Sequence, residues 1–265
     1  MLSFLTTSED KFKNLRIFNL VMGFFHMAQG IIMLLVSNDF SQTLTTSFVE
    51  GKQSGEELSF RNVTEDFVDL NLGPAVALFL FISAIAHFLL ASPLFYDWYV
   101  KNLKKNVNYA RWFEYSLSSS WMIVIIAILT GMLDAPSLIL MFTLNAMMIL
   151  FGYMMELHNQ ITEKTNWTAF IFGCIAGIVP WIIIAWYFIS AVTNFEGERP
   201  IPDFVYGILI SLFIFFNIFA VNMYMQYKKK GPWKNYLFGE AVYIILSLTA
   251  KSALAWQVWS GTMRG

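Results

Sequence analysis

Two ionisable side chains stand inside long apolar stretches of the sequence. Lys251 lies in YIILSLTAKSALAWQVW, and Glu114 lies in RWFEYSLSSS. The lysine is about nine residues, or roughly 13 Å of helical rise, from the end of its stretch, which is too deep for its ammonium group to reach water easily. An unpaired ammonium at this depth costs at least about 2.5–3.5 kcal/mol. A carboxylate partner, deprotonation or covalent conversion of the amine must therefore offset that cost.

Covalent conversion is a reaction that lysine supports, because its amine condenses with an aldehyde to form a Schiff base. An aldehyde that reaches this depth must itself be apolar, which points to retinal. Small side chains at Ala250, Ser252 and Ala253 leave room beside the amine, and Ser247 stands one turn back on the same helical face. The alternative is a Lys–Glu pair that serves structure only.

Glu114 is the acid that could balance a protonated Schiff base, which is a buried cation. Helical spacing places the hydroxyl of Ser118 one turn after Glu114, where it can donate a hydrogen bond to the carboxylate. Glu114 falls near the start of its apolar window unless the helix begins earlier, near Asn106. The sequence therefore predicts the counterion but does not bring it level with Lys251.

Aromatic and histidine side chains complete the set of candidates. Trp181 follows Pro180, which can bend a helix and open a cavity beside the ring. His26 and His87 fall in the first two apolar stretches, where neutral imidazoles can hold a water network or be ordinary buried histidines. The depths of the three histidines differ and no carboxylate of matching depth joins them, so we expect no metal site.

The composition places these residues in a membrane protein. Of 265 residues, 57% are apolar and 13% are charged, against about 25% charged in soluble proteins. This excludes a soluble enzyme, a disordered chain and a nucleic-acid binder. Windows long enough to span a bilayer as helices occur at 17–36, 74–96, 112–133, 135–155, 167–193, 204–225 and 241–260. Glu114 and Lys251 are the only charged residues inside them, and the fold class is an all-α bundle of seven membrane helices.

The distribution of basic residues predicts the orientation of the bundle. Twelve Lys and Arg residues lie on the side of the N-terminus and four, Lys52, Arg61, Arg199 and Arg264, on the opposite side, which places the N-terminus in the cytoplasm and the C-terminus outside. The first residues lack the apolar core of a cleavable signal peptide, so we expect the chain to begin near Met1. Residues 1–265 form one domain, in which 37–73 is a polar, acidic extracellular loop or cap.

Four blocks of the sequence resemble the heliorhodopsin family: RWFEYSLSSS, FGCIAGIVPW, FVYGILISLFIFFN and LSLTAKSALAWQ. The histidines of the first two spans and the inverted topology agree with this resemblance. It implies all-trans retinal on Lys251, Glu114 as the sole counterion, and Ser247 and Ser118 as their hydrogen-bond partners. It also implies dimers, a slow photocycle, and a cytoplasmic-side polar cavity at His26 and His87. The pocket candidates it adds are Met122, Asn145, Trp181 and Phe216.

Several functions remain open at this stage. A proton pump is disfavoured because Ile125 stands where microbial pumps place an internal proton donor, and four spans contain no acid. The favoured interpretation is a photoreceptor in the bilayer, without enzymatic activity and with no downstream partner indicated. A light-gated passive proton channel is the second, because Glu156 and Glu240 could line a path at the cytoplasmic edge. A seven-helix receptor or membrane hydrolase with a purely structural Lys251 is the third.

Overall fold

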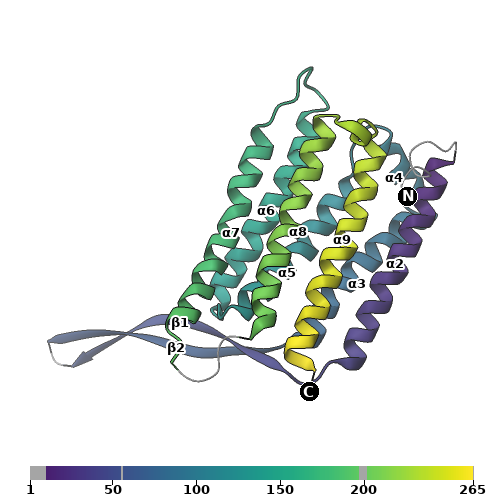
Figure 1. Cartoon of the computed structure of the whole chain (residues 1–265). Helices are drawn as coiled ribbons and strands as arrows, with labels where there is room; N and C mark the ends of the chain where they lie inside the picture. Colours follow the sequence, from purple (N-terminus) through teal and green to yellow (C-terminus); the bar gives the residue numbers. More distant parts are fainter. Residues whose placement is uncertain (1–9, 55, 197–201, 265) are drawn as a thin grey trace.

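The computed structural model describes residues 10–54, 56–196 and 202–264, and it is a helical bundle with one β-ribbon attached (Figure 1). The long helices are α2 (Lys11–Val36), α3 (Leu72–Ala91), α5 (Tyr109–Leu129), α6 (Ala135–His158), α7 (Thr168–Thr193), α8 (Asp203–Tyr227) and α9 (Tyr236–Val258). Shorter segments are α4 (Tyr96–Leu103), the 3-10 turn η1 (Gly231–Lys234) and the π-helical turn η2 (Trp259–Met263). The start of α2 and the end of α9 lie at opposite ends of the bundle (Figure 1).

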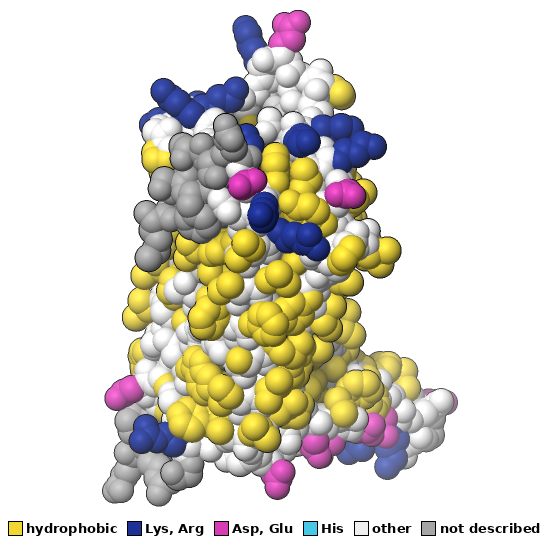
Figure 2. Space-filling model, turned by 90° about the vertical axis from the view of Figure 1, so that its right-hand side faces the viewer, with side chains coloured by type: hydrophobic (Ala, Val, Ile, Leu, Met, Phe, Trp, Pro, Cys, Tyr) yellow, Lys and Arg dark blue, Asp and Glu magenta, His cyan; other side chains and the backbone are white. Residues whose placement is uncertain are grey.

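The seven long helices are each apolar and long enough to cross a membrane, which confirms the seven predicted spans. Hydrophobic side chains cover the middle of the face in Figure 2, and charged side chains gather at its two ends. The protein is therefore a multi-pass membrane protein. The short helix α4 was not predicted, because its residues were divided between the second window and the loop that follows it. Residues 1–9, on which the signal-peptide prediction rests, lie outside the described residues, and so does Arg199 from the count of basic residues.

Short polar side chains fix where four of the helices begin. The side-chain oxygens of Asn71, Asn108, Asp134 and Asn235 accept hydrogen bonds from backbone N–H groups in the first turns of α3, α5, α6 and α9. Such caps satisfy N–H groups that have no partner within the helix. The cap at Asn108 starts α5 earlier than the window at 112 indicated, so Glu114 lies inside the helix.

Residues 37–73 differ from the loop or cap that the sequence analysis expected. Strands β1 (Ser41–Ser54) and β2 (Glu57–Asn71) form a long antiparallel ribbon that runs past the ends of the helices and projects beyond them (Figure 1). The backbone N–H of Thr45 donates to the carbonyl of Leu133 at 2.8 Å, next to an irregularity in the ribbon register between Leu44 and Thr45. The Thr, Val and Phe content of this segment favours strands in spite of its acidic residues.

Helix α5 occupies the interior of the bundle and is the most buried of the seven spans. It packs closely against α6 and α3, and it also contacts α7 and α8. Met122, Ile125 and Leu254 lie in the main apolar core, where α5 meets α9. This packing holds Glu114 and Lys251 between helices and away from the lipid-facing surface.

Candidate functional site

The amine of Lys251 is buried and bonded on two sides. Its Nζ donates hydrogen bonds to Oε1 of Glu114 and to Oγ of Ser247, both at 2.9 Å, and its side chain is 3% exposed. The ring of Tyr115 lies below it, with 5.2 Å between Nζ and the ring centroid. The structure thus brings together the lysine, the acid and the serine that the sequence analysis singled out.

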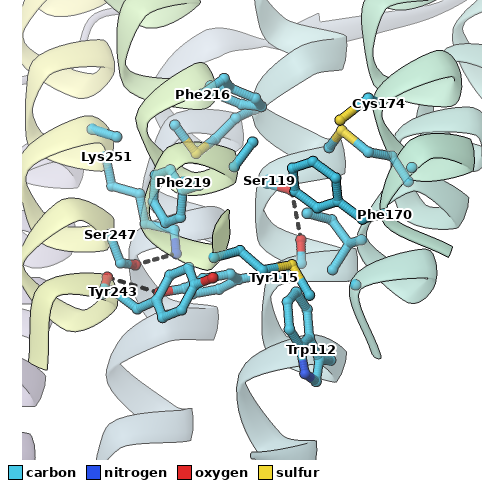
Figure 3. Close-up of a pocket in the computed structure, with 18 residues that line it drawn as sticks. Trp112, Tyr115, Ser119, Phe170, Cys174, Phe216, Phe219, Tyr243, Ser247 and Lys251 are labelled. Carbon is cyan, nitrogen blue, oxygen red and sulfur yellow. Dashed lines mark hydrogen bonds between the residues drawn. The ribbon is translucent and has the colours of Figure 1, made fainter. Parts of the chain in front are cut away.

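The direction of the Lys251 side chain brings its amine toward Glu114. Side chains of a helix tilt toward its N-terminus, and the long side chain of Lys251 therefore reaches back to Ser247, one turn closer to Glu114 (Figure 3). Arg111 on α5 and Glu240 on α9 form a further contact between these helices, near their starts. The side chains of Glu114 and Lys251 thus meet in spite of the depth mismatch noted from the sequence.

Glu114 is also held from a third helix. Oγ of Ser83 on α3 donates to Oε1 of Glu114 at 2.6 Å, while it shares its proton with the carbonyl of Phe79 at 3.1 Å. Ser118 is fully buried one turn after Glu114, but its Oγ forms no hydrogen bond of normal geometry within the described chain. Ser83 thus supplies a short hydrogen bond to Glu114, and no pattern in the sequence indicated that α3 would contribute it.

An apolar cavity opens beside the lysine (Figure 3). Its empty volume, which includes the open space at its mouth, is about 850 Å³. Lys251 and Ser247 stand at one end, and Met122 and Phe216 line it as the resemblance implied. The remaining lining residues are mostly aromatic or sulfur-containing: Trp112, Tyr115, Met148, Phe170, Cys174, Phe219, Met223 and Tyr243.

The two other pocket candidates support the cavity and do not line it. Trp181 packs edge-on against Phe216 with 5.4 Å between ring centroids. Asn145 on α6 donates to the hydroxyls of Ser119 and Ser120 on α5, each at 3.0 Å. The sequence analysis missed several lining residues, although helical spacing could have found Tyr115, Ser119 and Met122 on one face of α5.

A second, smaller cavity is polar and has an empty volume of about 390 Å³. It extends between Glu114 and His87 at one end and Arg111 and Glu240 at the other. His87 shares a hydrogen bond with Asn19 at 2.8 Å and stacks on His26, with 5.5 Å between ring centroids. His26 is fully buried, and neither of its ring nitrogens has a hydrogen-bond partner in the described chain.

A buried ionic cluster closes the far end of this polar cavity. Arg111 on α5 donates to Glu156 on α6 at 2.6 Å and to Glu240 on α9. Asn108 and Trp112 donate further hydrogen bonds to these carboxylates, at 2.7–2.9 Å. The sequence analysis counted Arg111 among the loop cations, but it is buried inside α5 because two carboxylates neutralise it there. Removing Arg111 from the count leaves the charge asymmetry in place.

The residues present fit a retinal group. An apolar aldehyde needs a lysine amine in the wall of an apolar cavity, and Lys251 lies in such a wall. The carboxylate that would balance the charge is already in contact with the amine. The described residues contain no group of three or more His, Cys, Asp or Glu side chains that could hold a metal ion.

These features define a class: a seven-helix membrane protein with a lysine–carboxylate pair inside the bundle, facing an apolar cavity. The sequence model of the heliorhodopsin family matches residues 15–263, so the chain belongs to the heliorhodopsin family. The family comprises retinal-binding, light-sensing proteins and is not a typical enzyme family. A comparison with curated proteins finds no match to the chain.

Proposed function

We propose that this protein is a photoreceptor in which all-trans retinal is bound to Lys251 as a protonated Schiff base, with Glu114 as its counterion. The observation that carries the proposal is the buried Lys251–Glu114 pair at 2.9 Å on the wall of the apolar cavity. In the attachment reaction the Nζ atom forms a double bond to the aldehyde carbon, and the aldehyde oxygen leaves as water. Bound retinal would supply visible absorption and a light-driven change of shape.

The residues of the chain have separate roles in this proposal. Glu114 balances the charge at Nζ, and Ser83 and Ser247 hold the two charged groups in position. The cavity wall, including Met122 and Phe216, excludes water and confines the cofactor. Because α5 and α9 carry the two partners and pack in one core, a charge movement between them acts on the contact between these helices.

Absorption spectroscopy of the purified protein tests the proposal. After incubation with all-trans retinal, the wild-type protein should show a visible band that Lys251→Ala abolishes. Glu114→Gln removes the counterion charge with little change in shape, so it should shift the band or move it to the near ultraviolet at neutral pH. A colourless wild-type protein would refute the retinal assignment, and an unchanged band in Glu114→Gln would refute the counterion.

A light-gated passive proton channel is the second candidate, and the polar cavity favours it. The cavity joins Glu114 and His87 to Glu240 within one space, and Glu156 lies beyond it in the ionic cluster. Photocurrents under voltage clamp separate the two functions. A channel passes a current that reverses with the proton gradient and is reduced by Glu240→Gln, whereas a sensor passes none.

The proposed arrangement in the membrane has the N-terminus in the cytoplasm and the ribbon outside. It is supported by the lysines of the N-terminal end of the bundle, which include Lys101, Lys104, Lys228 and Lys230. We also propose a homodimer. It is supported by the ribbon, which projects beyond the bundle and carries exposed apolar side chains.

A further inference from the structure

Helix α4 carries an outward face on which a lysine and a tryptophan stand one turn apart. Tyr99 and Leu103 are buried against the bundle, whereas Trp98 and Lys101 are exposed on the other side. The spacing of three residues puts Trp98 and Lys101 on one face of α4. A short amphipathic helix of this kind is typical of the membrane interface.

Aromatic rings from three helices fix this face in position. Trp98 lies 6.0 Å from Tyr109, and Tyr109 lies 5.5 Å from Tyr153, measured between ring centroids. Phe113 contacts the same Tyr153 at 5.7 Å. The aromatic cluster thus joins α4 to α5 and α6, and it orients Trp98 and Lys101 without a contact to the retinal cavity.

The polar groups on this face are available to a ligand. Within the described residues, Lys101 forms no ion pair, and the indole N–H of Trp98, whose side chain is 44% exposed, donates no hydrogen bond. Asp97 is the nearest acid in sequence and lies at the first turn of α4. Ammonium and indole N–H groups are both donors, so their ligand must supply acceptor oxygens and negative charge.

Below this face, α5 presents an apolar stripe. Tyr109, Phe113 and Leu117 follow one another at single turns, and Phe113 and Leu117 are each more than half exposed. The ammonium and the aromatic rings with polar tips thus stand near the start of α5, and the apolar side chains follow one and two turns further along it. A phospholipid likewise presents its phosphate and ester oxygens at one end and its acyl chains at the other.

We propose that Lys101, Trp98 and Tyr109 form a binding site for the headgroup of an anionic phospholipid, whose acyl chain lies along Phe113 and Leu117. Lys101 contacts the phosphate, and the indole N–H of Trp98 donates to a phosphate or ester oxygen. The two rings lie at the interface, where tryptophan and tyrosine are enriched. An anionic lipid thereby fixes α4 against α5 and α6.

Lipid binding to the full-length protein tests the site. Native mass spectrometry would compare retention of phosphatidylglycerol and phosphatidylcholine after reconstitution in an equal mixture of the two. The wild-type protein should retain phosphatidylglycerol preferentially. Lys101→Gln should reduce this retention about fivefold, as expected for the loss of one basic contact near a membrane surface, whereas Lys101→Arg should preserve it.

Matched variants separate this site from a general effect of charge. Lys230→Gln removes an exposed lysine at the same end of the bundle and should leave retention unchanged. Trp98→Phe keeps the ring but removes the donor, and it should weaken retention of phosphatidylglycerol. An equal loss in Lys101→Gln and Lys230→Gln, or no preference between the two lipids, would overturn the proposal. Displacement of the lipid by inorganic phosphate at millimolar concentration would overturn it as well, since the site would then recognise a free anion.

Discussion

At the scale of single residues, the site depends on how the buried carboxylate of Glu114 divides its hydrogen bonds between two donors. Oε1 of Glu114 receives hydrogen bonds from both Lys251 and Ser83. Charge-assisted hydrogen bonds of this kind contribute about 1.5–3 kcal/mol each, so the serine on α3 affects how strongly the carboxylate interacts with the amine. In contrast, Ser118 stands one turn after Glu114 on the same helix, and its hydroxyl interacts with the carboxylate without a hydrogen bond of normal geometry in the described chain.

Ser83→Ala should change the colour of the retinal-loaded protein. Loss of the hydrogen bond concentrates the negative charge of Glu114 on the contact with Lys251, so we expect a shift of the visible absorption maximum. Ser116→Ala is the control, because Ser116 lies on α5 and donates only to the carbonyl of Phe113. Absorption spectra of both variants at neutral pH measure the effect, and identical maxima in wild type and Ser83→Ala would contradict it.

At the scale of elements, α5 and α6 approach closely because a glycine lies between them. A Cβ at Gly152 on α6 would stand 2.4 Å from the ring of Trp112 on α5. The indole of Trp112 in turn donates to Glu156 at 2.7 Å and lines the apolar cavity. One residue without a side chain therefore allows both the helix contact and the position of a wall residue.

Gly152→Ala should lower the thermal unfolding midpoint, because the added methyl group displaces Trp112. Overpacking of this kind typically costs about 1–3 kcal/mol, which exceeds the gain of about 1 kcal/mol in helix propensity. Gly207→Ala on α8 is the matched control, since its nearest neighbour would be 4.0 Å away, and it should be neutral or stabilising. Tryptophan fluorescence during heating compares the two variants. Equal unfolding midpoints would show that the Trp112 ring moves aside without a loss in the free energy of unfolding.

At the scale of the whole molecule, the ribbon is the part that the bundle does not bury. The pairing of Gly51 with Phe60 and of Gln53 with Leu58 places Val49, Leu58 and Phe60 on one face. All three are more than half exposed. The opposite face carries the pair of Glu50 and Arg61, with Lys52 and Ser59 beside it toward the tip of the ribbon. Because isolated two-stranded ribbons are marginal in water, the apolar face is the side that a second copy would cover.

In the proposed homodimer, Phe60→Glu should therefore weaken the contact and reduce the dimer fraction of the purified protein. It places a charge on the apolar face without changing the bundle, so the visible band of the retinal-loaded protein should remain. Ser59→Glu adds the same charge to the opposite face of the ribbon and should leave the dimer intact. Native mass spectrometry measures the dimer fraction of each variant. An equal effect of both variants would exclude the apolar face as the dimer contact.

The sequence determined the features that follow from local composition. Seven apolar stretches specify seven spans because the bilayer requires helices of that length, and an unmatched Lys251 in one of them specifies a lysine-centred site. Four sequence blocks, two of which contain Glu114 and Lys251, also indicated the family, which the match over residues 15–263 confirms. Met122 and Phe216 were expected at a pocket, and they line the apolar cavity.

The tertiary structure decided everything that depends on how helices are placed against one another. The contact of Glu114 with Lys251 follows from the packing of α5 and α9, and the contribution of Ser83 follows from the packing of α3 on α5, neither of which a linear pattern contains. The burial of Arg111 likewise needed Glu156 and Glu240 to arrive from two other helices. Hydrophobic windows indicate which segments enter the membrane. The partners of a buried charge, in contrast, are determined by packing between helices that are far apart in the sequence.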